Sequence, residues 1–175
     1  MTESATPSQT VGPFFSIGLD WFDGRYVVPK ERPGAFWIRG RVYDGAGEPI
    51  LDALVETFQA GPNGRFEASA GFRGFGRCPT DAAGMFEVHT VKPGGVLDAM
   101  GRLQSPHIAV VVFARGVIEH VVTRIYFGDE DNDSDPLLSS IAEERRHTLV
   151  ALPNGAAYRF DVRLRGEHET VFFAI

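Results

Sequence analysis

The chain has 175 residues, of which 43% are hydrophobic and 23% are charged, and these values are ordinary for one globular domain. Its formal net charge of −6 argues against a nucleic-acid surface, because such a surface needs clustered cations. No apolar run reaches the roughly 18–20 residues of a membrane span, and the N-terminus lacks a secretory-signal pattern. The single cysteine, Cys78, excludes an internal disulfide framework. We therefore expect a cytoplasmic protein.

The chain opens with a segment rich in chain-stiffening residues, TPSQTVGPFFSIGL, at 6–19. Pro7 and Pro13 fix φ and lack backbone donors, and Gly12 permits a positive φ before the second proline. Such a segment cannot pair efficiently in the middle of a sheet. The sequence therefore predicts an extended arm and loop over residues 1–34, laid across a surface by the apolar side chains within it.

Short apolar stretches separated by Gly- and Pro-containing turns follow the arm. Several alternate apolar and polar residues with period two, whereas 107–114 is a continuous apolar run typical of a strand buried on both faces. Only two residues, 115–116, connect this run to the next. Long loops are expected at 20–34 and 61–80. The predicted strands are 36–44, 53–60, 84–91, 107–114, 116–127, 156–164 and 169–175. This distribution indicates an all-β sandwich or barrel over residues 35–175.

One short helix stands out near 135–146. Asp135 can cap its first turn, and Pro136 suits the first helical position. The acidic run at 128–135 lacks the glycine and the distal glutamate of an EF-hand loop. We therefore expect a solvated loop there rather than a calcium site.

The residues alone provide no self-sufficient catalytic constellation. The five histidines form no His-x-His or His-x₃-His pair, and one cysteine cannot supply a thiolate cluster. A Gly-x-Ser-x-Gly nucleophile elbow and a glycine-rich phosphate loop are both missing from the sequence. From these residues alone, we expect a chain with neither a metal site nor a catalytic nucleophile.

The stretch IRGRVYDGAGEPILDALVETFQAGPNGRF at 38–66 resembles the signature region of the intradiol ring-cleavage dioxygenases. Within this stretch, the sequence departs from the family pattern at Thr57 and Phe58. GRCPTDAAGMFEVHTVKPG at 76–94 resembles the segment that comes next in that family. The resemblance continues through PHIAVVVFARG (106–116), TRIYFGDE (123–130) and RFDVRLRGEHETVFFAI (159–175). It implies an antiparallel β-sandwich of the intradiol dioxygenase type, with one short helix and long loops.

The resemblance also implies where a metal would lie, because the family holds a non-haem ferric iron with two tyrosines and two histidines. The His-x-His position of the family reads His107 and Ala109 here. The turn at 93–94 is followed directly by Gly95, Val96 and Leu97, with no tyrosine among them, and the loop at 65–77 contains none. With three of the four ligands missing, we predict that this chain binds no metal and that His107 is an interior histidine without a catalytic role.

This pattern is similar to that of the α subunits in heteromeric members of the family. The resemblance implies αβ units in a larger oligomer, with Fe(III) bound by the partner β subunit. It further implies O₂-dependent intradiol cleavage of 3,4-dihydroxybenzoate to 3-carboxy-cis,cis-muconate, in a pocket that the α arm helps to form. The substrate-binding residues that it implies are Thr10, Gly12, Pro13, Phe14 and Arg115. An arginine there suits the substrate carboxylate, because its guanidinium offers a fixed fork of donors.

Other interpretations of these residues stay open on sequence alone. The arm could stabilise its own domain, and Arg115 at a strand end could be an ordinary ion-pair partner. The alternative function is a non-enzymatic binding or structural module of the same fold, since a fold does not determine function. An independent dioxygenase with a different metal arrangement is disfavoured by the tyrosine and histidine inventory.

Overall fold

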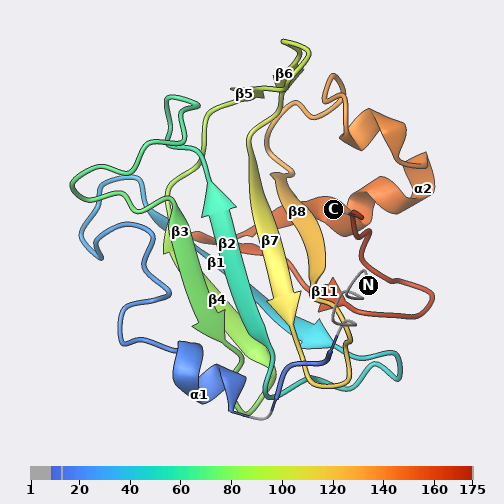
Figure 1. Cartoon of the computed structure of the whole chain (residues 1–175). Helices are drawn as coiled ribbons and strands as arrows, with labels where there is room; N and C mark the ends of the chain where they lie inside the picture. Colours follow the sequence, from blue (N-terminus) through green and yellow to red (C-terminus); the bar gives the residue numbers. More distant parts are fainter. Residues whose placement is uncertain (1–8, 13, 175) are drawn as a thin grey trace, which may run out of the picture.

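The structure, a computed structural model, describes residues 9–12 and 14–174 and is built mainly of β-strands (Figure 1). The strands are β1 (Phe36–Tyr43), β2 (Leu54–Gln59), β3 (Phe75–Pro79), β4 (Met85–Thr90), β5 (Val96–Leu97), β6 (Leu103–Gln104), β7 (His107–Phe113), β8 (Val121–Phe127), β9 (Val150–Asn154), β10 (Ala157–Arg159) and β11 (Val162–Arg163). The α-helices are α1 (Phe15–Leu19) and α2 (Glu143–Arg146), and the 3₁₀ turns are η1 (Leu138–Ser140) and η2 (His147–Leu149). The expected all-β class is confirmed.

Nine strands form one sheet in the order β11-β1-β10-β9-β8-β7-β2-β3, with β4 paired to β1. β1 runs antiparallel to β4 but parallel to β10 and β11, where Trp37 pairs with Ala157 and Val42 with Val162. β8 and β9 are also parallel. The expectation of an antiparallel sheet is therefore wrong for these three pairs. Parallel pairing needs a crossover connection, and the segment with η1, α2 and η2 supplies one between β8 and β9.

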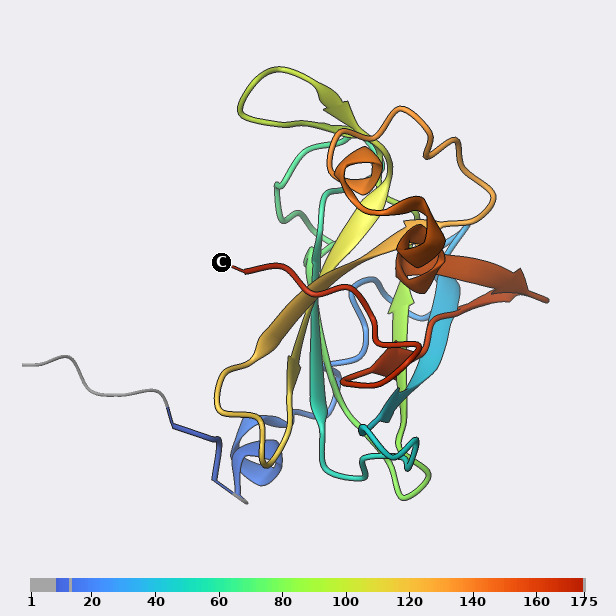
Figure 2. The ribbon, with the colours of Figure 1, turned by 90° about the vertical axis from the view of Figure 1, so that its right-hand side faces the viewer.

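One apolar core lies inside this nearly closed sheet. Seen in Figure 2, β1 and β4 lie to one side of the core, and β2 and β7 lie to the other. The edges of β3 and β4 approach each other, with the Glu87 N–H donating to Cys78 Sγ at 3.5 Å. On β7, Ile108, Val110 and Val112 are fully buried, whereas the residues between them are half-buried. The run at 107–114 is therefore buried on one face rather than on both.

Several predicted elements differ from those in the structure. β3 lies inside the predicted loop at 61–80, and the predicted strand at 169–175 is reduced, over its described residues, to an isolated bridge between Phe173 and Val122. The predicted helix at 135–146 divides into η1 and α2 because Ile141 is extended, which lets its side chain pack beside Tyr126. No helix in the described part of the chain combines the length and apolar character needed to cross a bilayer.

Candidate functional site

The loop between β7 and β8 carries Arg115, the charged residue among those that the resemblance selects. This loop runs from residue 114 to residue 120 and is longer than the two-residue connection expected from the sequence. Gly116 turns the chain with a φ of +83°, a conformation that favours glycine. The Arg115 side chain is 61% exposed and forms an ion pair with Asp52, which lies just before β2. Its guanidinium therefore stands at the surface at this end of the sheet.

The N-terminal arm contacts the same loop. Thr10 Oγ1 accepts a hydrogen bond of 3.1 Å from the N–H of Gly116. Gln9 and Val11, together with loop and C-terminal residues such as Phe173, line a cavity of about 470 Å³. The structure thus brings two of the expected substrate residues, Thr10 and Arg115, to one end of the sheet.

The other three expected residues have different outcomes. Gly12 is exposed, and its carbonyl accepts a hydrogen bond from Phe15 N at 3.2 Å, just before α1. Phe14 is 75% exposed and does not contribute to the core. Pro13 lies outside the described residues. The structure therefore places Gly12 and Phe14 beside the start of α1.

The expected extended arm is wrong for residues 15–19, which form α1. Backbone donors after the last proline are satisfied by helical turns, as in the 3.0 Å bond from Gly18 N to Phe14 O. Arg77 holds the end of this helix, because its guanidinium donates to the Leu19 carbonyl at 2.9 Å and lies over the Trp21 ring. Arg77 is in turn paired with Glu56 on β2.

The arm nevertheless leaves much apolar surface in solvent. Its exposed apolar residues are Phe14, Ile17, Leu19, Trp21 and Phe22. Phe22 is 100% exposed, whereas Val27 and Val28 further along are buried in the core or beside it. Large exposed apolar side chains gathered in one short segment are a feature of interaction sites.

At the opposite end of β7, His107 is buried and has a hydrogen-bond partner. Its Nδ1 lies 2.8 Å from the Ser105 carbonyl oxygen, which can only accept, so Nδ1 carries the proton and Nε2 keeps a lone pair. Burial, and secondarily the charge of Arg124, lowers the pKa of His107. The expected interior histidine is confirmed.

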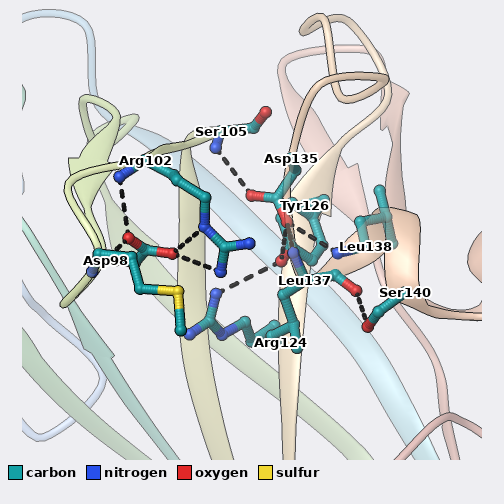
Figure 3. Close-up of polar contacts among 10 residues, drawn as sticks. Asp98, Arg102, Ser105, Arg124, Tyr126, Asp135, Leu137, Leu138 and Ser140 are labelled. Atoms are coloured by element: carbon teal, nitrogen blue, oxygen red, sulfur yellow. Dashed lines mark hydrogen bonds and ion pairs between the residues drawn. The ribbon is translucent and has the colours of Figure 1, made fainter.

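A buried carboxylate organises this end of the sheet (Figure 3). Asp135 is fully buried and accepts hydrogen bonds from Ser105 N at 2.8 Å and from the Tyr126 hydroxyl at 3.1 Å. It also accepts from Leu137 N at 2.9 Å and Leu138 N at 2.8 Å, so it caps the first turn as predicted. The expected solvated loop at 128–135 is therefore wrong at its last residue.

Comparison with known proteins fixes the family. A family model described as "Dioxygenase" matches residues 25–166. The "Protocatechuate 3,4-dioxygenase alpha chain" of Burkholderia cepacia is 40% identical over 199 aligned positions, which cover 99% of each chain. This chain belongs to the intradiol ring-cleavage dioxygenase family.

Two further dioxygenases support this assignment. The "Protocatechuate 3,4-dioxygenase beta chain" of Burkholderia cepacia is 31% identical and matches 76% of this chain and 65% of that one. A solved structure, the dioxygenase domain of a dioxygenase carbohydrate-binding protein fusion from Streptomyces sp. SirexAA-E, aligns with a TM-score of 0.61. Its identity is 26%, and the alignment covers 93% of this chain and 99% of that domain.

The residues of this intradiol dioxygenase chain do not fit the ferric iron of the family. The stretch that resembles the His-x-His strand of the family has His107 but carries Ala109 two residues later. Burial raises the pKa of Tyr126 to about 12, so its hydroxyl stays protonated and serves Asp135 rather than a metal. Within residues 9–12 and 14–174, no group of three or more His, Cys, Asp or Glu side chains could hold a metal ion.

The sequence did not identify Asp52 or Asp135 as residues of these sites. Asp52 lies at the Arg115 end of the sheet, and Asp135 lies at the His107 end. Asp52 lies within the signature region at 38–66, but nothing in that stretch pairs it with Arg115, and only the fold brings the two together. The Asp-Pro pair at 135–136 partly indicated the role of Asp135, because a capping carboxylate accepts hydrogen bonds from backbone N–H groups at the start of a helix. The fold adds the two partners, Ser105 and Tyr126, that bury it.

Proposed function

We propose that this chain is the α subunit of a heteromeric protocatechuate 3,4-dioxygenase. The observation that carries the proposal is the 40% identity to a protocatechuate 3,4-dioxygenase alpha chain over 99% of both chains. The reaction inserts both atoms of O₂ between the two hydroxylated carbons of 3,4-dihydroxybenzoate and gives 3-carboxy-cis,cis-muconate. The misfit between this chain's residues and a ferric iron supports a division of labour, in which the partner β subunit binds Fe(III).

In this proposal the bound iron supplies activation of the catechol ring toward O₂, and this chain supplies walls and charge for the pocket. The pocket residues are Thr10, Gly12, Pro13, Phe14 and Arg115. Arg115 is the counter-charge for the substrate carboxylate. The exposure of Arg115 supports this binding role. Asp52 pairs with the guanidinium through one oxygen, which leaves others of its five N–H donors available for a substrate carboxylate.

The same proposal assigns the exposed apolar arm to a subunit interface. Residues 1–34 contact the β subunit, and residues 35–175 form a β-sandwich domain of the intradiol type. The apolar side chains between Phe14 and Phe22 would become buried in the αβ unit, as expected for an obligate interface. The αβ units assemble further into a larger oligomer. A cytoplasmic location is part of the proposal and agrees with the unpaired cysteine Cys78.

The test is to express this chain alone, its candidate partner alone, and both together. Iron content and O₂ uptake with 3,4-dihydroxybenzoate are then measured for each preparation. We expect the isolated chain to be iron-free and inactive and the co-expressed complex to contain iron and cleave the substrate. Stoichiometric iron in the isolated chain would contradict the division of labour. Failure of the two chains to form a complex would favour a non-enzymatic module of the same fold.

A further inference from the structure

The strand pair β7–β8 places an arginine directly opposite the position of the missing second histidine. In its register, Ala109 pairs with Arg124, and His107 pairs with Tyr126. Residues directly opposite each other in an antiparallel pair share one face, with Cβ atoms roughly 4.5–5.5 Å apart. Residues two apart on a strand also share a face. His107, Ala109 and Arg124 therefore lie on the same face.

Arg124 is half-buried on this face and lacks a carboxylate partner among the described residues (Figure 3). Its Nη1 donates to the Tyr126 hydroxyl at a long 3.4 Å. That hydroxyl itself donates to Asp135, whose carboxylate already accepts from three backbone N–H groups. The positive charge of Arg124 is therefore not neutralised by an ion pair within the described chain.

The charge of Arg124 acts on the one retained histidine. His107 keeps the hydrogen-bond arrangement typical of a metal ligand, with Nδ1–H donating to a carbonyl oxygen and the Nε2 lone pair free. Arg124 nevertheless holds a fixed positive charge on the same face as this ring, and that charge opposes a second positive charge at the Nε2 side of His107. Coulomb repulsion grows with the product of the charges, so a divalent or trivalent cation at the same place is repelled more strongly than a proton.

We propose that Arg124 excludes metal ions from this face, so that this chain is kept metal-free by a fixed positive charge as well as by missing ligands. Restoring the second histidine at position 109 is then insufficient to create a metal site. Neutralising Arg124 must accompany it. This inference concerns the β7–β8 face alone and does not depend on a partner subunit or on the substrate.

The test measures metal affinity directly, with Ni²⁺ as the probe because imidazole is a suitable ligand for it. Isothermal titration is carried out on the full-length chain and on Arg124→Gln, Ala109→His and the double variant Ala109→His/Arg124→Gln. We expect the double variant to bind Ni²⁺ at least tenfold more tightly than Ala109→His. The parent chain and Arg124→Gln define the background from the remaining histidines.

Equal affinities for Ala109→His and the double variant would overturn the proposal, whether both bind tightly or neither binds. Ala109→His/Arg124→Lys is the matched control, since it keeps the charge and should bind as weakly as Ala109→His. Ala109→His/Arg124→Met is a second neutral variant, for use if the glutamine variant fails to fold by circular dichroism. Because no partner is present, failure of this test is distinguishable from failure to form an αβ complex.

Discussion

The two ends of β7 show opposite ways of using polar residues. At the His107 end, a buried histidine and a buried carboxylate find their hydrogen-bond partners within the chain, in Ser105 and Tyr126. At the other end, Arg115 is mostly exposed. The arm beside it exposes apolar side chains to solvent. The first end satisfies its buried polar groups within the chain, whereas the second leaves a charge and large apolar side chains exposed.

The largest expected effect is on stability at the His107 end. Asp135→Asn keeps the shape of the side chain but replaces one acceptor oxygen with a donor, among groups that all donate to Asp135. We expect the free energy of unfolding to fall by about 3 kcal/mol. Urea unfolding measures it. The exposed Asp133→Asn is the matched control and should change it by less than about 0.5 kcal/mol. Similar losses in both variants would contradict this view of Asp135.

The next effect concerns function at the opposite end. In the αβ complex, Arg115→Ala should raise KM for 3,4-dihydroxybenzoate about 10- to 100-fold, the range expected when a hydrogen-bonded charge pair is lost. KM for catechol, which lacks the carboxylate, should change less than about threefold. The exposed Arg165→Ala, outside the arm, is a control for loss of an arginine elsewhere. Equal increases for both substrates would remove the carboxylate role of Arg115.

A smaller effect is expected from pH. Burial, followed by the charge of Arg124, lowers the pKa of His107 in the folded chain, whereas an unfolded histidine titrates near pH 6.5. The unfolded state therefore binds more protons, and the free energy of unfolding falls as the pH drops below about 6.5. His107→Gln should flatten this fall in urea unfolding between about pH 7 and pH 5. The exposed His120→Gln is the control, and the same slope in both variants would contradict the assignment.

The smallest effect tests the contact between the arm and the β7–β8 loop. Thr10→Val removes the hydroxyl that accepts from Gly116 N, and water can replace it because the site is exposed. We expect amide hydrogen exchange at Gly116 to accelerate a few-fold, with little change in global stability. Thr10→Ser keeps the hydroxyl and should retain the protection. Unchanged exchange in the valine variant would mean that the arm is not held there in solution.

The sequence predicted those strands that show a clear local pattern of apolar residues. The alternating stretch at 36–44 became β1, and the apolar run at 107–114 became β7, each within one residue of the predicted boundary. β3 could not be found in the same way, because its sequence FGRCP has neither alternation nor strong β propensity. It exists because its backbone pairs with β2, for example Cys78 with Val55. Tertiary pairing thus overrides weak local preference.

The residues of the candidate site remain a prediction from the resemblance, and their arrangement could not be predicted from the sequence. The resemblance selected Thr10 and Arg115, yet their proximity depends on a contact between residues 106 positions apart in the chain. The two prolines do not predict α1, because a proline restricts its own φ and the preceding residue, and the helix begins after Pro13, at Phe15. The burial of Asp135 was missed because an acidic run suggests solvent, and only the fold brings Ser105 to its carboxylate.

The central position of β1 has a consequence for how the chain folds. Trp37 and its neighbours pair with residues near Ala157, so two of the three partners of β1 are synthesised long after β1 itself. A sheet with such long-range pairings is expected to form slowly, because a long loop must close before the contacts stabilise it. A ribosome-bound chain has an unpaired edge on β1 until β10 and β11 emerge. That edge is a place where a nascent chain can pair with another chain, so its protection favours correct folding.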